Sequence, residues 1–342
     1  MTELQEKIVV HRTLETAEDL FHELSPATGD LWRFADYVEN IDSHLTQWLF
    51  RGQSNDVDGR RWDLRPTVHR ATNDIHPSLP GTEILRARAM PSAMPYLNGA
   101  AVRFMESGLV HTFAQIVDDH GLVVPGDNHA SRDGRMRDTN LGLEPTLFPP
   151  PSEVAIFGLA QHHGIPTRLL DWTRKPFIGA YFAAQPVAQR RASGSRPLET
   201  ECPYFSIFAV RRSAAEACET LDPEIHFLTV PSATNSNLHA QDGVFSLVQP
   251  LSEPGDAPLP AIDEVLIKHA ERIWERDNGR WQSLFPLLVE FRIPVREARV
   301  VMHTLRNMGV TAASIYPGLD GVARSIMKER QLCIWQKRGE RS

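Results

Sequence analysis

The sequence predicts an α+β fold, with a mixed, mainly antiparallel central sheet flanked by helices. Apolar runs of strand length occur at 204–210 and 286–293, whereas 18–45 and 262–274 place apolar side chains every three or four positions, as amphipathic helices do. The two kinds of segment do not alternate regularly, as they would around a parallel sheet. With 342 residues, 42% of them hydrophobic, the chain is long enough to bury a sizeable core.

Composition argues against several classes of protein. A formal net charge of −7 argues against a protein that coats nucleic acid through a basic surface. It does not exclude contact with nucleic acid in a local basic groove. The three cysteines form no Cys-x-x-Cys pair, so neither a disulfide framework nor a zinc site is predicted. Residues 1–20 lack the apolar core of a signal peptide, and no apolar run reaches the roughly 18–20 residues that span a bilayer. We therefore expect a cytoplasmic protein with no membrane contact.

In the first half of the chain, proline and polar residues separate the predicted elements. Pro66 has no backbone N–H, which limits hydrogen bonding to a neighbouring strand at this position. The stretch 118–151 is rich in Asp, Gly, Asn and Pro. The expected elements are helices within 18–44, a strand at 47–51, a polar turn at 56–61, an irregular segment at 62–70, a mostly helical segment at 82–117 broken near Pro91 and Pro95, and an insert at 118–151 interpreted as a mobile loop or lid.

The second half begins with a helix at 153–163, for which Ser152 is a plausible N-cap and Gly164 with Pro166 a stop signal. Thr173 is placed to cap the next helix, which we expect to end before Pro186. The other predicted elements are strands at 167–172, 204–210, 227–230, 243–248 and 286–293, and helices at 262–274, 295–308 and 319–332.

The most informative motif is the polar stretch 161–173, which lies between two apolar runs. Alternation along a strand places Thr167, Leu169, Asp171 and Thr173 on one face and Arg168, Leu170 and Trp172 on the other. A largely polar face inside a domain needs partners or a ligand, because an unpaired buried carboxylate costs several kcal/mol. Two interpretations remain open: Asp171 takes part in a binding site, or it anchors the N-terminus of the next helix.

A second polar motif ends the strand at 47–51. The guanidinium of Arg51 projects from a rigid element, and Gly52 lets a ligand or another segment approach the backbone. Such an arginine suits a phosphate or a carboxylate. The alternative is an arginine paired with a buried acid such as Asp171.

Other polar residues extend the candidate site. Gln161 hydrogen-bonds in both directions and suits a sugar or an amide, while His162 and His163 end a helix and lack the i, i+4 spacing of zinc helices. Gln241 and Asp242 are expected at the mouth of the strand 243–248. Glu290 is interpreted as an outward-facing edge residue of its strand.

Four motifs, taken in order, resemble the FRG domain, which is named after its Phe-Arg-Gly triplet. The resemblance covers roughly 40–250, with a weaker tail to about 325, and implies one FRG-type domain over 1–342. That domain would have a helical lead-in at 1–46, the insert at 118–151 and a helix–strand–helix extension at 261–335. The four motifs are Phe50-Arg51-Gly52-Gln53, 62–66 with Arg70, 160–173 followed by 180–183, and 240–245.

The order of Arg51, the polar strand and Gln241 also resembles that of ADP-ribosyltransferases. This second resemblance implies an enzyme that takes NAD as substrate, of the toxin or antiphage-effector kind, in which the arginine grips the pyrophosphate and nicotinamide ribose. Gln241 could position the ribose but not neutralise its developing charge, so the acid that such chemistry needs would be Asp242 or Glu290. The catalytic candidates are Arg51, Thr167, Asp171, Gln241 and Asp242. The NAD-binding candidates are Arg51, Gly52, Gln53, Gln161, His162, Thr167, Arg168, Thr173 and Tyr181.

Two other functions stay open from the sequence. The same cleft would serve a non-catalytic sensor of a nucleotide or another small ligand. Arginines around the motifs would suit local contact with nucleic acid; they are Arg60, Arg61, Arg65, Arg70, Arg168, Arg174, Arg190 and Arg191. A macromolecular acceptor is a further expected partner of the enzyme.

Overall fold

The computed structural model describes residues 3–35, 48–54, 64–69, 94–129, 132, 148–192, 203–212, 224–230, 235–248, 260–277 and 285–327. Several predictions fall outside these residues and are not considered further: the turn at 56–61, Arg60, Arg61, Arg70, the start of the segment 82–117, half of the insert 118–151, and the end of the helix 319–332.

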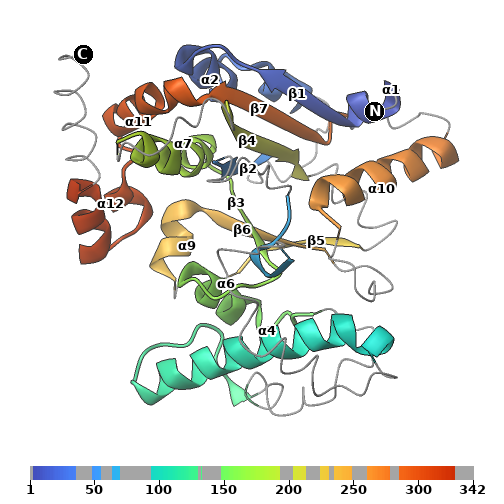
Figure 1. Cartoon of the computed structure of the whole chain (residues 1–342), viewed down its shortest axis with the longest axis vertical. Helices are drawn as coiled ribbons and strands as arrows, with labels where there is room; N and C mark the ends of the chain where they lie inside the picture. The colour runs from blue at the N-terminus through green and yellow to red at the C-terminus, as the bar shows by residue number, and fades with distance from the viewer. Residues whose placement is uncertain are drawn as a thin grey trace.

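The described residues form a mixed α+β fold around one mainly antiparallel sheet, as predicted. The strand order is β1-β7-β4-β2-β3-β6-β5, and within it β1 with β7 is the parallel pair. Figure 1 shows the sheet twisting from β1 and β7 at one end to β6 and β5 at the other. The strands are β1 Val9–Thr13, β2 Trp48–Gln53, β3 Leu170–Thr173, β4 Tyr204–Arg211, β5 Ile225–Leu228, β6 Gly243–Val248 and β7 Leu288–Pro294.

Helices cover one face of the sheet with a large apolar cluster. Alternate residues of β2, β4 and β7, among them Phe50, Ile207 and Phe291, point into this cluster and are fully buried. The helices that pack on them are α2 Ala17–Leu24, α7 Pro176–Ala192, α11 Ala298–Asn307 and α12 Ala312–Ile315. Short 3-10 helices η1 Asp30–Ala35 and η6 Val295–Glu297 adjoin them.

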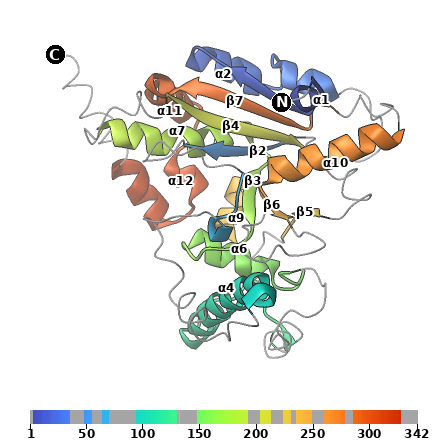
Figure 2. The ribbon, with the colours of Figure 1, turned by 45° about the vertical axis from the view of Figure 1, so that its right-hand side comes forward.

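The opposite face carries a second apolar cluster, built on Leu49, Phe208 and Leu288. It is covered by α1 Glu3–Ile8 and α10 Ile262–Asp277, which lie on the side of the sheet away from α7 and α11 (Figure 2). At the β6 end, α4 Met94–Asp119 packs against α6 Val154–His162, and a third cluster joins them to Phe245 and Leu247. Within the described residues, no helix is long and apolar enough to cross a membrane.

Two glycines allow α7 to lie directly on β2. A Cβ on Gly52 would come within 2.0 Å of the backbone oxygen of Gly179, and one on Gly179 within 3.1 Å of the Phe50 side chain. The glycine of the Phe-Arg-Gly triplet is therefore required by helix packing. Because α7 follows β3 directly, this close contact also fixes β3 beside β2.

Several local predictions were wrong. The N-cap of α6 is Glu153, without a side-chain cap bond, rather than Ser152. α7 continues through Pro186 to Ala192, because Val187 and Ala188 are buried in the core. Strand β1 was not anticipated.

Glu290 is also placed differently from the prediction. It is buried on β7, between β1 and β4, and accepts a hydrogen bond from the Ser206 hydroxyl at 2.8 Å. His11 and Arg292 also contact its carboxylate. An edge position is therefore excluded for Glu290.

Candidate functional site

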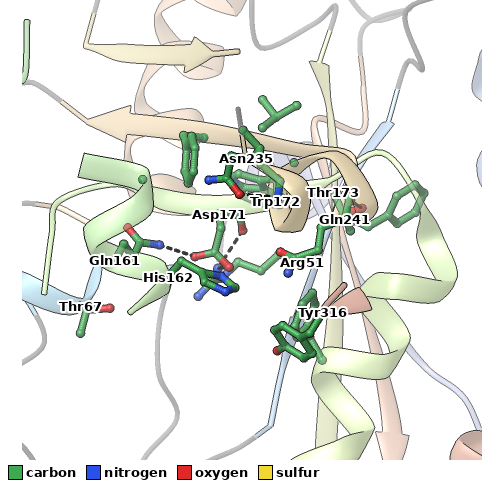
Figure 3. Close-up of a pocket in the computed structure, with 18 residues that line it drawn as sticks. Arg51, Thr67, Gln161, His162, Asp171, Trp172, Thr173, Asn235, Gln241 and Tyr316 are labelled. Carbon is green, nitrogen blue, oxygen red and sulfur yellow. Dashed lines mark hydrogen bonds and ion pairs between the residues drawn. The ribbon is translucent and has the colours of Figure 1, made fainter. Parts of the chain in front are cut away.

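A cavity of about 360 Å³ opens where β2 and β3 meet the ends of α6 and α9 Ser236–Gln241 (Figure 3). Its volume lies near the lower end of the range of about 300–1,000 Å³ that is usual for small-molecule sites. The lining is mixed, with aromatic rings beside amides, hydroxyls and one ion pair. The polar side chains that line it are Arg51, Thr67, Gln161, His162, Asp171, Thr173, Asn235 and Gln241, and the aromatic ones are Phe50, Trp172, Phe182, Phe245 and Tyr316.

Arg51 and Asp171 form an ion pair in the cavity. The antiparallel pairing of β2 with β3, with Phe50 opposite Thr173, brings their chains together. The Arg51 guanidinium donates to the Asp171 carbonyl oxygen at 2.7 Å and lies 3.1 Å from the carboxylate. The arginine side chain is 12% exposed and the aspartate 57%. The arginine thus holds a carboxylate that still faces open space.

A short hydrogen-bond chain fixes the other side of this carboxylate. The Thr167 hydroxyl donates to the Gln161 side-chain oxygen at 2.5 Å, and the Gln161 amide donates to Asp171 at 2.6 Å. Thr167 is buried and does not line the cavity. Asp171 therefore projects between Arg51 and Gln161, as Figure 3 shows.

The turn from α9 to β6 forms the wall opposite Gln161. The Thr173 hydroxyl donates to the Gln241 carbonyl at 2.5 Å and accepts from the Lys175 backbone N–H at 3.0 Å, next to the start of α7. Gln241 is the last residue of α9. Asp242 adopts a left-handed backbone conformation (φ 48°) and pairs with Arg174 at 2.9 Å, outside the cavity lining.

Aromatic side chains from three segments form one wall of the cavity. The His162 ring lies 5.9 Å from that of Tyr316, and Tyr316 lies 6.4 Å from Phe182. Burial lowers the pKa of His162, and the charges of His163 and Arg324 lower it further. Burial likewise raises the pKa of the Tyr316 hydroxyl. At neutral pH both rings are therefore uncharged, which suits stacking against a flat ligand.

Besides Thr167, three predicted binding residues lie outside the cavity lining. Arg168 is buried and paired with Glu106 of α4 at 2.8 Å. Gln53 and Tyr181 are also buried, and neither of them is among the lining residues. Within the described part of the chain, no three His, Cys, Asp or Glu residues are grouped as a metal site.

Comparison with known proteins gives one match, and it includes α6, β3 and α7, which build part of this site. Residues 135–192 match the family model of the FRG domain. This stretch is similar to the FRG domain. No curated protein and no solved structure matches the chain. The resemblance to the FRG family is therefore confirmed, whereas the resemblance to ADP-ribosyltransferases stays a prediction.

The FRG match supplies only part of the cavity. From 135–192 come Gly158, Gln161, His162, the residues of β3 and Phe182. Arg51, the α9–β6 turn and Tyr316 are brought in from outside the matched stretch, by strand pairing and by the packing of α12 near α9. In this chain, segments outside the matched residues thus complete the cavity.

Sequence reasoning missed three polar or aromatic lining residues: Thr67, Asn235 and Tyr316. Asn235 caps α9, its side chain accepting from the Leu238 N–H at 3.0 Å, so its position before a short helix was the available signal. Tyr316 directly follows α12, and nothing in the local pattern distinguishes it from a core residue. Its role in the lining depends on tertiary packing alone.

Proposed function

We propose that the chain binds NAD in the cavity and cleaves its bond between nicotinamide and ribose. The observation that carries the proposal is the carboxylate of Asp171, held between Arg51 and Gln161 and exposed to the cavity. A fixed carboxylate is the group that best stabilises a sugar cation as a leaving group departs. Arg51 then acts as a positioning residue that holds this carboxylate.

The proposed reaction needs no cofactor beyond NAD. The bond between C1′ of the ribose and the nicotinamide nitrogen breaks, and its electron pair neutralises the pyridinium. Positive charge develops on C1′ and the ring oxygen, facing Asp171. Water or a nucleophilic group of an acceptor molecule then attacks C1′ and releases its proton, giving ADP-ribose or an ADP-ribosylated acceptor. This would make the protein an NAD glycohydrolase or an ADP-ribosyltransferase.

The positions of the candidate acids favour Asp171. Asp242 pairs with Arg174 and does not line the cavity, and Glu290 is buried on β7 with Ser206, His11 and Arg292. Among the described lining residues, Asp171 is the one carboxylate. The aromatic wall of His162, Phe182 and Tyr316 offers uncharged rings for the nicotinamide.

Nicotinamide release from NAD by the full-length protein tests the proposal. Asp171→Asn keeps the size of the side chain but removes the charge, so we expect release to fall by about 100-fold or more, as when a preorganised electrostatic group is lost. NAD binding should persist in this variant. Glu264→Gln is the matched control, because it removes an acid that is 51% exposed and paired with Arg65, outside the cavity lining.

One outcome would contradict the enzymatic proposal: saturable NAD binding to the wild-type protein with no nicotinamide released, whether water alone or candidate protein and nucleic-acid acceptors are present. That result would favour the second candidate, a non-catalytic nucleotide sensor. The Arg51–Asp171 pair favours this alternative, since an arginine at 3.1 Å offsets part of the charge that Asp171 would offer to a cation.

Contact with nucleic acid has less support. Of the arginines considered for that function, Arg65 pairs with Glu264, Arg168 with Glu106, and Arg174 with Asp242. Each of these arginines is thus paired with an acid of the same chain. We therefore do not propose a nucleic-acid function.

A further inference from the structure

Arg51 and Arg324, two cations near the cavity, differ in what offsets their charge. The Arg51 guanidinium is largely buried, donates a hydrogen bond to the Asp171 carbonyl oxygen and forms an ion pair with the Asp171 carboxylate. A phosphate placed at Arg51 would also lie against the negative charge of Asp171. Arg51 is therefore poorly suited to bind the diphosphate of a nucleotide.

Arg324 is the second cation, and it lies at the aromatic wall. It belongs to the helical stretch 319–327, which follows α12, and its side chain is exposed to solvent. Its guanidinium carbon lies 5.4 Å from the centre of the Tyr316 ring. Within the described part of the chain, no acid lies within ion-pair distance of Arg324, in contrast to Arg51, Arg65 and Arg174.

The charges of Arg324 and Asp171 act on the same tyrosine. Burial has the largest effect on the pKa of Tyr316 and raises it. The charge of Arg324 lowers this pKa, and the charge of Asp171 raises it. Tyr316 itself lines the cavity. Arg324 thus lies close enough to the cavity to act on a ligand that extends past Tyr316.

We propose that Arg324, positioned over Tyr316, binds the phosphate groups of the nucleotide at the mouth of the cavity. This inference rests on the proposed function and adds the place of the charged half of the ligand. A cavity of about 360 Å³ is near the lower limit for small-molecule sites, so it encloses the nicotinamide riboside half and leaves the phosphates at the rim. Contact with the ring restricts the guanidinium while leaving its N–H groups open for phosphate.

A pair of ligands that differ by one phosphate tests this inference. Nicotinamide mononucleotide and nicotinamide riboside would be titrated into the full-length protein by calorimetry. Arg324→Ala should weaken binding of the mononucleotide about three- to tenfold, the range for one charge-assisted contact near the surface, and leave the riboside within about twofold. Raising the salt concentration should reduce the preference for the mononucleotide over the riboside in the wild-type protein.

Two further variants sharpen the test. Arg324→Lys keeps the charge and should retain most of the preference for the phosphorylated ligand. Arg296→Ala removes one positive charge that pairs with Glu15, outside the cavity lining, and should leave both affinities unchanged. If Arg324→Ala weakens the binding of both ligands equally, or weakens the binding of neither, the proposed phosphate subsite is wrong.

A second ligand pair separates this inference from the proposed function. If the wild-type protein binds neither nicotinamide compound, the proposal of an NAD-cleaving site fails, and ADP and adenosine then test the subsite. A preference for ADP that disappears in Arg324→Ala would keep Arg324 as a phosphate-binding residue for another nucleotide. The absence of any such preference in both ligand pairs would reject the subsite itself.

Discussion

The Glu106 carboxylate accepts two hydrogen bonds from Arg168, one from the backbone N–H at 2.6 Å and one from Nε at 2.8 Å. Arg168 also lies over the Phe148 ring, 4.4 Å from its centre. Both members of the pair are almost completely buried. They tie α4 to the segment that leads into β3, only three residues before Asp171.

Removing one charge of this pair should be strongly destabilising. Glu106→Gln leaves the Arg168 charge buried without its counter-charge, so we expect a loss of about 3–5 kcal/mol in the free energy of unfolding. Chemical denaturation measures the loss. Glu264→Gln, in a pair that is partly exposed, should cost about 1 kcal/mol or less. Equal effects of the two substitutions would show that burial does not decide the contribution of the Arg168–Glu106 pair.

Individual site residues show what the sequence could predict at this scale. Arg51, Asp171 and Gln241 were chosen as one site, and the structure brings them to one cavity. Arg168 was also proposed as a ligand-binding residue, but a strand pattern does not tell whether a polar side chain meets a ligand or a buried partner. The partner of Arg168 comes from α4, which no feature of the 161–173 motif indicates.

At the scale of elements, α7 continues past the proline at which its sequence predicts an end. Pro186 has no N–H to donate within the helix, yet the residues after it complete the core around α7. A proline in a helix interior costs about 3 kcal/mol relative to alanine. Burial of Val187 and Ala188 offsets this cost.

Pro186→Ala should therefore stabilise the protein. The substitution restores a backbone donor in α7, and we expect the free energy of unfolding to rise by about 1–3 kcal/mol. Thermal and chemical denaturation of the full-length variant would measure it. A decrease in stability would show instead that the packing of α7 on β2 depends on the local bend that a proline imposes.

Element boundaries followed from sequence where the pattern was local. The strand predicted at 243–248 has the bounds of β6, and the strand at 204–210 is one residue shorter than β4. The strand predicted at 167–172 is β3, which spans Leu170–Thr173, because the preceding residues bond to Gln161 and Glu106 instead of to a neighbouring strand. β1 was missed because its strand character comes from pairing with β7, at the far end of the sequence.

At the scale of the whole molecule, two histidines make stability depend on pH. Burial lowers the pKa of His269 below its ordinary value of 6.5, against the opposing effect of Glu224. Burial, with the nearby charges of His163 and Arg324, also lowers that of His162. The unfolded chain therefore binds more protons than the folded protein in mildly acidic solution.

The sign of this linkage gives a specific expectation. Stability should be fully present above pH 6.5 and should decline as the pH falls from 6.5 through the lowered pKa values of the folded state. Melting temperatures measured between pH 7.5 and pH 5 would show the decline, taking about 6.5 as the midpoint of an unperturbed histidine. His269→Gln should flatten this dependence. An unchanged slope in this variant would assign the decline to other groups.

The cavity as a whole was the part least accessible to sequence analysis. Its walls come from β2, η2 Thr67–His69, α6 with β3, the α9–β6 turn and Tyr316, which are far apart in the chain. Motifs identified β2, β3 and the α9–β6 turn because each carries unusual polar residues. Thr67 and Tyr316 carry no such signal, and only the packing of the complete fold brings them to the site.

The position of β1 bears on how the protein can be shortened. Its five residues fill the outer side of β7 in parallel register, from Val9 opposite Leu288 to Thr13 opposite Arg292. A version that begins after β1 would lack this cover and present unpaired backbone groups along β7, a template on which strands of other molecules can add. Tags and truncations at the N-terminus therefore bear on solubility, although that terminus lies outside the family match.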